Sequence, residues 1–164
     1  FYGLTVMDER TLKTIFSSKT DAWATPQSFY DKLNKTYTFT LDPCASAKTA
    51  KCTSYFTEED DGLEKDWSGH SVFMNPPYGK GIGEWLRKAR EEGQKDNTSV
   101  VCLIPSRTDT KYFHDYCMRS DLLYFVKGRL KFGDSKNSAP FPSMIVVFNG
   151  TNNGMPLVGT IGAV

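Results

Sequence analysis

The chain has 164 residues, of which 39% are hydrophobic and 24% charged, and its formal net charge is +1. These values fit one globular domain and exclude a disordered chain. The small net charge also excludes a strong overall attraction to nucleic acid, although a local basic face stays open. No apolar stretch approaches the length of a membrane span, the sequence shows no signal peptide, and the four cysteines have spacings typical of no zinc site. We therefore expect a cytoplasmic protein without metal, disulfide or membrane contact.

The first forty residues predict an arm followed by a capped helix. Residues 1–22 show no clear period and are expected to form an N-terminal arm, with one domain over residues 23–164. Thr25-Pro26-Gln27 predicts a helix start, because threonine is a favoured cap and proline a favoured first helical residue. Residues 38–41 then alternate like a strand, which ends at an Asp-Pro pair.

Strands and helices alternate through the rest of the chain. The predicted strands are residues 52–56, 71–74, 98–104, 122–126 and 143–148, and the predicted helices are residues 84–93 and 109–119. This alternation indicates an α/β fold with a mostly parallel sheet. The last two strands have no helix between them, which predicts an antiparallel hairpin at one edge. The tail from Asn149 predicts a loop with room for one more strand.

Asn75-Pro76-Pro77-Tyr78 is the most informative segment, because it follows a buried strand where ligands bind in open α/β sheets. The two prolines stiffen the turn and remove two backbone donors. The asparagine amide accepts and donates hydrogen bonds, and the tyrosine ring offers a flat face. Together these four residues suit a planar ligand group that carries an NH2, whose two hydrogens the Asn75 oxygen and the Pro76 carbonyl could accept. A rigid turn that only ends the strand is the alternative.

Two acidic segments are candidates for ligand binding near the first strands. Asp42 ends a strand ahead of small residues, where its carboxylate can face a cationic group, although an Asp-Pro turn explains the pattern as well. Residues 58–63, Glu-Glu-Asp-Asp-Gly-Leu, could bind ribose hydroxyls or the amine and face of an adenine ring. A solvated acidic loop is the alternative there.

Two later segments combine basic and aromatic side chains. Arg107 follows a buried strand and could contact phosphate. Residues 128–143 hold Arg129, Phe132 and Phe141 around a polar loop, where an aromatic ring could pack on a base swung out of its helix. An exposed loop with one ring in the core is the alternative.

The ordered set of these segments resembles the small phage-type DNA N6-adenine methyltransferases, a Dam-like family that uses S-adenosylmethionine. The match covers residues 23–148 and consists of WATP, DPCAS, DGL with the following DW, NPPYG, IPSRTDTKYFH, GRLKF and APFPS. NPPY by itself indicates methylation of an amine, and the whole set points to adenine in DNA.

The resemblance implies a Rossmann-like methyltransferase fold, DNA as partner, a flipped-out adenine as substrate and S-adenosylmethionine as cofactor, in a phage or prophage protein of a bacterial cytoplasm. It implies site residues in three groups. They are the catalytic residues Asn75, Pro76, Pro77 and Tyr78, the cofactor-binding residues Trp23, Thr25, Pro26, Asp42, Cys44, Ala45, Asp60, Asp61, Leu63 and Asn75, and the substrate-binding residues Tyr78, Arg107, Arg129, Phe132 and Phe141.

The chain departs from the family pattern at one point, because Cys44-Ala45-Ser46 stands where a glycine-rich GxG is usual. This departure keeps open a non-catalytic DNA-binding decoy on the same scaffold. The NPPY motif also allows an RNA base or a protein glutamine amide as the acceptor. Both a monomer and a homodimer fit the sequence.

Overall fold

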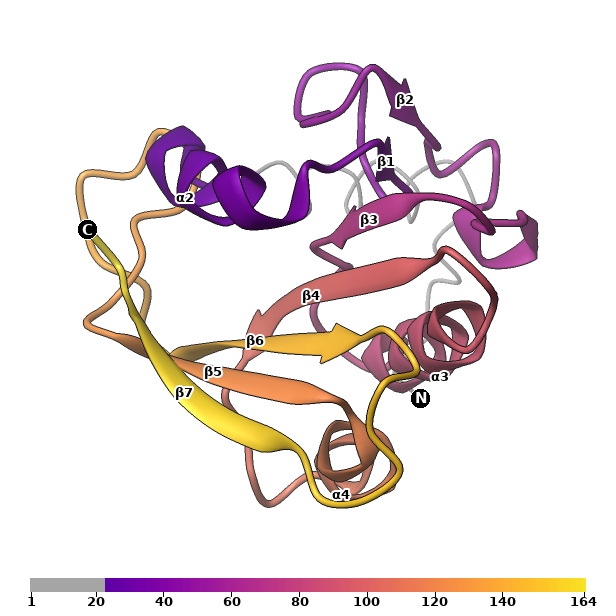
Figure 1. Ribbon diagram of the computed structural model, residues 1–164. Helices are drawn as coiled ribbons and strands as arrows, with labels where there is room; N and C mark the ends of the chain where they lie inside the picture. The colour runs from indigo at the N-terminus through magenta and orange to yellow at the C-terminus, as the bar shows by residue number, and fades with distance from the viewer. Residues whose placement is uncertain (1–22) are drawn as a thin grey trace, which may run out of the picture.

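A seven-stranded sheet lies at the centre of the computed structural model, which describes residues 23–164 (Figure 1). The arm predicted at residues 1–22 lies outside the described residues. The strands are β1 Leu41–Asp42, β2 Ser54–Tyr55, β3 Ser71–Met74, β4 Ser99–Pro105, β5 Leu122–Lys127, β6 Ser143–Phe148 and β7 Leu157–Gly162. The helices are α2 Gln27–Tyr37, α3 Ile82–Gly93 and α4 Lys111–Asp115, with short 3-10 turns η1 Gly62–Glu64 and η2 Cys117–Arg119.

The strand order is β2-β1-β3-β4-β6-β5-β7, and most neighbours are parallel. Only β6 runs against its neighbours, β4 and β5, whereas β7 pairs with β5 in parallel. The predicted α/β fold, with a mostly parallel sheet and an antiparallel strand pair near one edge, is confirmed. The strand foreseen in the tail is β7, which covers the outer side of β5 and so forms the sheet edge itself.

Helices cover both faces of the sheet (Figure 1). On one face, α2 buries Phe29, Tyr30 and Leu33 against alternate residues of β3, β4 and β6. On the other face, α3 and α4 pack against the remaining residues of the same strands. Because side chains alternate along a strand, each strand supplies both layers, which explains why β4 and β6 read as continuous apolar runs. None of the helices in residues 23–164 is long and apolar enough to cross a bilayer.

The start and end of α2 differ from the prediction. Pro26 stands at the N-cap, and the Thr25 side chain does not cap the helix, because its hydroxyl accepts a hydrogen bond from Asn75 instead. The strand predicted at residues 38–41 is reduced to β1, since Thr38 adopts a left-handed conformation with φ of 50° that ends the helix. The Asn34 side chain accepts the Phe39 backbone N–H at 2.7 Å and stabilises this turn.

The helix predicted at residues 109–119 is also shorter. It splits into α4 and η2, because Tyr116 leaves helical geometry at φ −122°. The strand predicted at residues 52–56 is likewise limited to β2, which pairs only with the short β1. By contrast, β3 and β6 have the predicted bounds.

Candidate functional site

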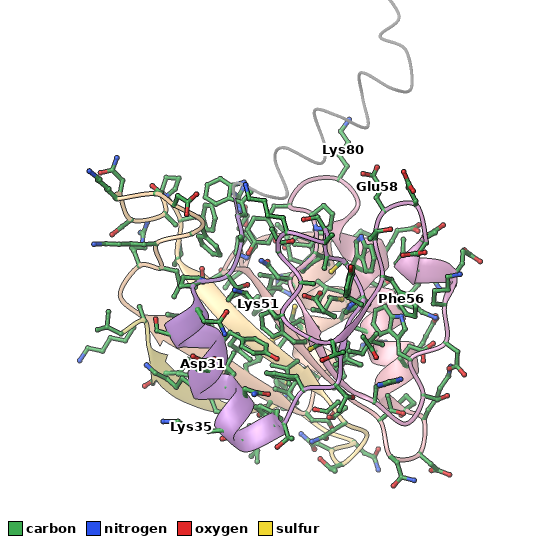
Figure 2. All side chains as sticks on the ribbon, turned by 90° about the horizontal axis from the view of Figure 1, so that it is seen from above. Asp31, Lys35, Lys51, Phe56, Glu58 and Lys80 are labelled. Carbon is green, nitrogen blue, oxygen red and sulfur yellow. The ribbon has the colours of Figure 1, made fainter. Side chains whose placement is uncertain are left out.

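One edge of the sheet gathers nearly all of the predicted site residues. The parallel strands β1, β3 and β4 end there at Asp42, Met74 and Pro105. The antiparallel β6 begins at the same edge, because Ser143 pairs with Pro105. The loops after these strands and before β6 therefore lie next to one another, as the view from above shows, with Lys80 pointing outward from the loop that follows Tyr78 (Figure 2).

The Asn75 amide is fixed by three hydrogen bonds. Its Nδ2 donates to the Trp23 carbonyl at 2.8 Å and to the Thr25 hydroxyl at 3.1 Å. Its Oδ1 accepts from the Tyr78 hydroxyl at 2.9 Å. A carbonyl can only accept, so the contact with Trp23 determines which side of the amide carries the nitrogen. The oxygen is consequently held on the Tyr78 side and keeps acceptor capacity for another donor.

The Tyr78 ring, whose hydroxyl contacts this oxygen, packs with three other aromatic rings, and we call the four the aromatic cluster: Trp23, Tyr78, Phe132 and Phe141. All six pairs of rings lie in contact range, from 5.1 Å between the centroids of Trp23 and Phe141 to 6.3 Å between those of Tyr78 and Phe132. Burial raises the pKa of the Tyr78 hydroxyl well above its usual value, so this group stays protonated. Phe132 is buried and the other three rings are half-buried, so the cluster forms a packed apolar group beside one amide acceptor.

The segment between β5 and β6, residues 128–142, is tied to this cluster. The Gly133 N–H donates to the Ala24 carbonyl at 2.8 Å, which brings Phe132 against Trp23. Arg129 is exposed and donates to the Ala139 carbonyl at 3.2 Å, which links the two ends of the segment. The Arg107 guanidinium lies 5.9 Å from the centre of the Phe141 ring. The structure thus brings these predicted substrate-binding residues together.

Asp42 is almost fully buried at the end of β1, with 4% of its surface exposed. Burial raises the pKa of its carboxyl to about 6, although the backbone N–H groups of Lys51 and Cys44 donate to it. None of the ion pairs between described residues involves Asp42. The charge of Lys51 acts on this carboxylate without forming an ion pair with it, so this buried position can still accept a positively charged ligand group.

The loop after Asp42 is connected to the NPPY segment. The Asn75 backbone N–H donates to the Cys44 thiol, whose pKa is raised by burial. The Ala45 N–H donates to the Phe56 carbonyl at 3.0 Å, and the Phe56 N–H donates to the Asp42 carbonyl at 2.9 Å. These bonds hold the loop in place where the sequence lacks the usual glycines.

The residues of the acidic segment after β2 differ in whether they have partners within the protein. The Asp60 carboxylate accepts from the Thr57 backbone and hydroxyl at 2.8 and 2.9 Å, bonds that lower its pKa and close a local turn. Asp61 is exposed, and Leu63 is half-buried. Between them Gly62 packs directly on the Pro43 carbonyl. The structure therefore places Asp61 and Leu63 beside the loop after β1, whereas Asp60 has a structural partner.

Of the NPPY prolines, Pro76 is buried and Pro77 exposed, and Pro26 lies half-buried next to Thr25. Sequence reasoning missed that Trp23 and Thr25 contact Asn75 directly. It also did not single out Ser143, a buried polar residue. The one sign of it in the sequence is a serine at the start of an otherwise apolar strand. Within residues 23–164, no group of three or more His, Cys, Asp or Glu side chains could hold a metal ion.

Comparison with known proteins shows the family to which the sequence is similar. A family model described as DNA N-6-adenine-methyltransferase (Dam) matches residues 13–158. The DNA N-6-adenine-methyltransferase of Haemophilus phage HP1 (strain HP1c1) is 31% identical over 140 residues, which are 80% of each chain. The protein of the same description from Escherichia phage T1 is 28% identical over 95 residues, 57% of this chain and 39% of the relative. A putative methyltransferase YfdM of Escherichia coli (strain K12) is 37% identical over 65 residues, 35% of this chain and 71% of the relative.

Proposed function

This chain belongs to the DNA N-6-adenine-methyltransferase (Dam) family, and from this premise we propose how its sheet edge methylates the exocyclic amine of adenine in DNA. The enzyme takes the target adenine out of the helix and holds its amine at Asn75. The observation that carries this proposal is the orientation of the Asn75 amide, which keeps its oxygen toward the aromatic cluster. The relatives from phages HP1 and T1, both DNA N-6-adenine-methyltransferases by name, favour DNA over an RNA base or a glutamine amide as the acceptor.

Asn75 and the Pro76 carbonyl are the proposed acceptors for the two hydrogens of the adenine amine. In the structure the Asn75 oxygen accepts from Tyr78, but a carbonyl oxygen has two lone pairs and can take a second donor. Holding both hydrogens fixes the direction of the nitrogen lone pair. Orientation of this kind supplies much of the acceleration in transfer reactions, because the entropy cost is met when the base binds. No further side chain is needed as a base at this step.

The aromatic cluster is the proposed surface for the flipped base. Moving a base out of the duplex costs a few kcal/mol, and stacking on an aromatic ring returns about 1–3 kcal/mol. Tyr78 is connected to Asn75, so the stacking face and the amine acceptor form one unit. Arg107 and Arg129 are exposed beside the cluster and fit contacts with phosphate groups around the extruded nucleotide.

S-adenosylmethionine is the proposed cofactor, and the residues at the end of β1 fit it. When bound, it supplies an electrophilic methyl group on a positively charged sulfur. Asp42 is the residue that we assign to its amino group, because this buried carboxylate has no ion pair among the described residues. The residues that we assign to the rest of the cofactor are Trp23, Thr25, Pro26, Cys44, Ala45, Asp61 and Leu63.

The direct test of this function uses methyl-labelled S-adenosylmethionine with DNA, RNA and protein as separate acceptors. We expect label in DNA only, and hydrolysis of that DNA should release it as N6-methyladenine. DNA that contains only G·C pairs is the matched control and should stay unlabelled. Label in RNA, protein or cytosine would contradict the proposal. A chain that binds DNA but transfers no label to any acceptor would instead be the decoy.

Cofactor binding should depend on pH through Asp42. The carboxylate form attracts the amino group of the cofactor, and the pKa of about 6 means that it is lost as pH falls through that value. We expect calorimetry to show weaker binding of S-adenosylmethionine at pH 5.5 than at pH 7.5. Asp42→Asn should bind weakly at both pH values. Asp31→Asn, at an exposed position on α2, is the control that should keep the pH dependence.

A further inference from the structure

Ser143 carries a buried hydroxyl that has no hydrogen-bond partner within residues 23–164. Its side chain is 2% exposed, and its Oγ is one of two buried side-chain polar atoms without a partner among the described residues, the other being Arg90 Nε. A buried hydroxyl without a partner lowers the stability of the folded protein. Native proteins leave few such groups, and each needs an explanation.

The hydroxyl lies at the sheet edge that carries the site. Ser143 is the first residue of β6, which lies beside β4 (Figure 1), and it pairs with Pro105 at the end of β4. The Ser106 N–H donates to the Pro142 carbonyl at 2.8 Å, so the adjacent pair of Pro105 and Ser143 is a position without ladder hydrogen bonds. Proline is tolerated there because it has no N–H to donate.

The face on which Ser143 lies follows from alternation along the strand. Ile145 and Val147 belong to the core layer under α2, and Ser143 is in phase with them. The same layer contains Phe132, with Trp23 and Phe141 packed against it. Asn75 projects to this face as well, because its amide contacts Trp23 and Thr25 ahead of α2. The free hydroxyl and the amide acceptor therefore lie on the same face of the sheet as the aromatic cluster, on different strands.

Asn75 follows β3 and Ser143 begins β6, and these two strands are two positions apart in the sheet. β3 and β6 are separated by β4, so their axes lie about 10 Å apart at the usual strand spacing. An adenine whose amine is held by Asn75 turns ring nitrogens, which accept hydrogen bonds, toward its other edges. We propose that Ser143 is a base-binding residue that donates its hydroxyl hydrogen to a ring nitrogen of the target adenine. This inference rests on the proposed function and adds a specificity contact to it.

A site that must hydrogen-bond its substrate is unsatisfied until the substrate enters. The partner that Ser143 lacks in the free protein is supplied by the base. This accounts for a serine at the start of a strand whose other residues are all apolar. The same arrangement selects against bases that present no acceptor at that edge.

Stability and activity should respond in opposite ways to Ser143→Ala. The variant loses a group without a partner, so its melting temperature should equal or exceed that of the wild type. Its kcat/KM for DNA should fall about tenfold or more, with unchanged S-adenosylmethionine binding in calorimetry. Ser143→Cys, of similar size with a weaker donor, should give an intermediate rate. Ser120→Ala is the matched control, because the buried Ser120 hydroxyl donates to the Cys117 carbonyl at 2.7 Å. It should melt lower and keep its activity per folded molecule.

DNA substrates with 1-deaza-, 3-deaza- or 7-deazaadenine identify the acceptor atom. One of these should lower the wild-type rate and leave the Ser143→Ala rate unchanged, since the contact is already absent. Normal DNA methylation by Ser143→Ala would overturn the inference and leave the proposed function intact. A wild-type chain that methylates no adenine would refute the proposed function, and this inference with it.

Discussion

Asn75→Ala should abolish methyl transfer to DNA. The substitution removes the proposed acceptor for the adenine amine and also the two bonds that connect the NPPY segment to Trp23 and Thr25. Loss of one fixed polar contact at a reacting centre typically lowers kcat by about 10²–10³-fold. Here a fall of at least that size is expected, since the orientation of the amine depends on this group. Single-turnover methylation of DNA with labelled cofactor measures it.

Two observations separate a chemical role of Asn75 from a structural one. S-adenosylmethionine binding, measured by calorimetry, should be mostly retained in Asn75→Ala: Trp23 and Thr25 lose their bonds to the amide, but Asp42 and its loop stay in place. Tyr78→Phe is the matched variant: it keeps the aromatic ring and removes only the hydroxyl that contacts the Asn75 oxygen. It should retain most of the activity. Wild-type rates in Asn75→Ala would show that this amide does not hold the amine.

Gly62→Ala should have the second large effect, on both stability and cofactor binding. A Cβ at this position would lie 2.0 Å from the Pro43 carbonyl oxygen and 3.2 Å from the Trp85 ring. The backbone at Gly62 cannot shift without a cost in free energy, because the Gly62 carbonyl accepts a hydrogen bond from the indole of the fully buried Trp67 at 2.9 Å. Overpacking of this kind costs about 1–3 kcal/mol or more. Chemical denaturation should show that loss.

The same substitution should weaken S-adenosylmethionine binding, since it pushes the loop after β2 away from the loop after Asp42. Gly154→Ala is the matched control, because a Cβ there would meet only the Asn152 side chain at an ordinary 3.7 Å. It should change neither stability nor binding. If Gly62→Ala unfolds at the wild-type denaturant concentration and binds the cofactor normally, the close approach of the two loops is unimportant.

The local hydrophobic pattern of the sequence was sufficient to predict the bounds of strands that are buried on both faces. β3 and β6 have the predicted bounds, because an uninterrupted apolar run needs a place between two layers. It failed at short elements: where a strand was predicted at residues 38–41, only β1, Leu41–Asp42, forms, since Thr38 lies in a turn whose Phe39 N–H donates to the Asn34 side chain. The helix predicted at residues 109–119 is divided into two short helices, because the backbone of Tyr116 leaves helical geometry.

The sequence alone was sufficient for the reaction class and for a prediction of where the site lies, because proline stiffness, an amide and a ring at a strand end are properties of adjacent residues. It also placed Asp42 at a strand end, where burial then gives it a raised pKa. Only the tertiary structure decided which way the Asn75 amide faces, since the groups that orient it lie 50 and 52 residues away in the chain. The partnerless hydroxyl of Ser143 likewise became visible only in the fold, because hydrogen bonding between distant segments leaves no periodic signal in a sequence.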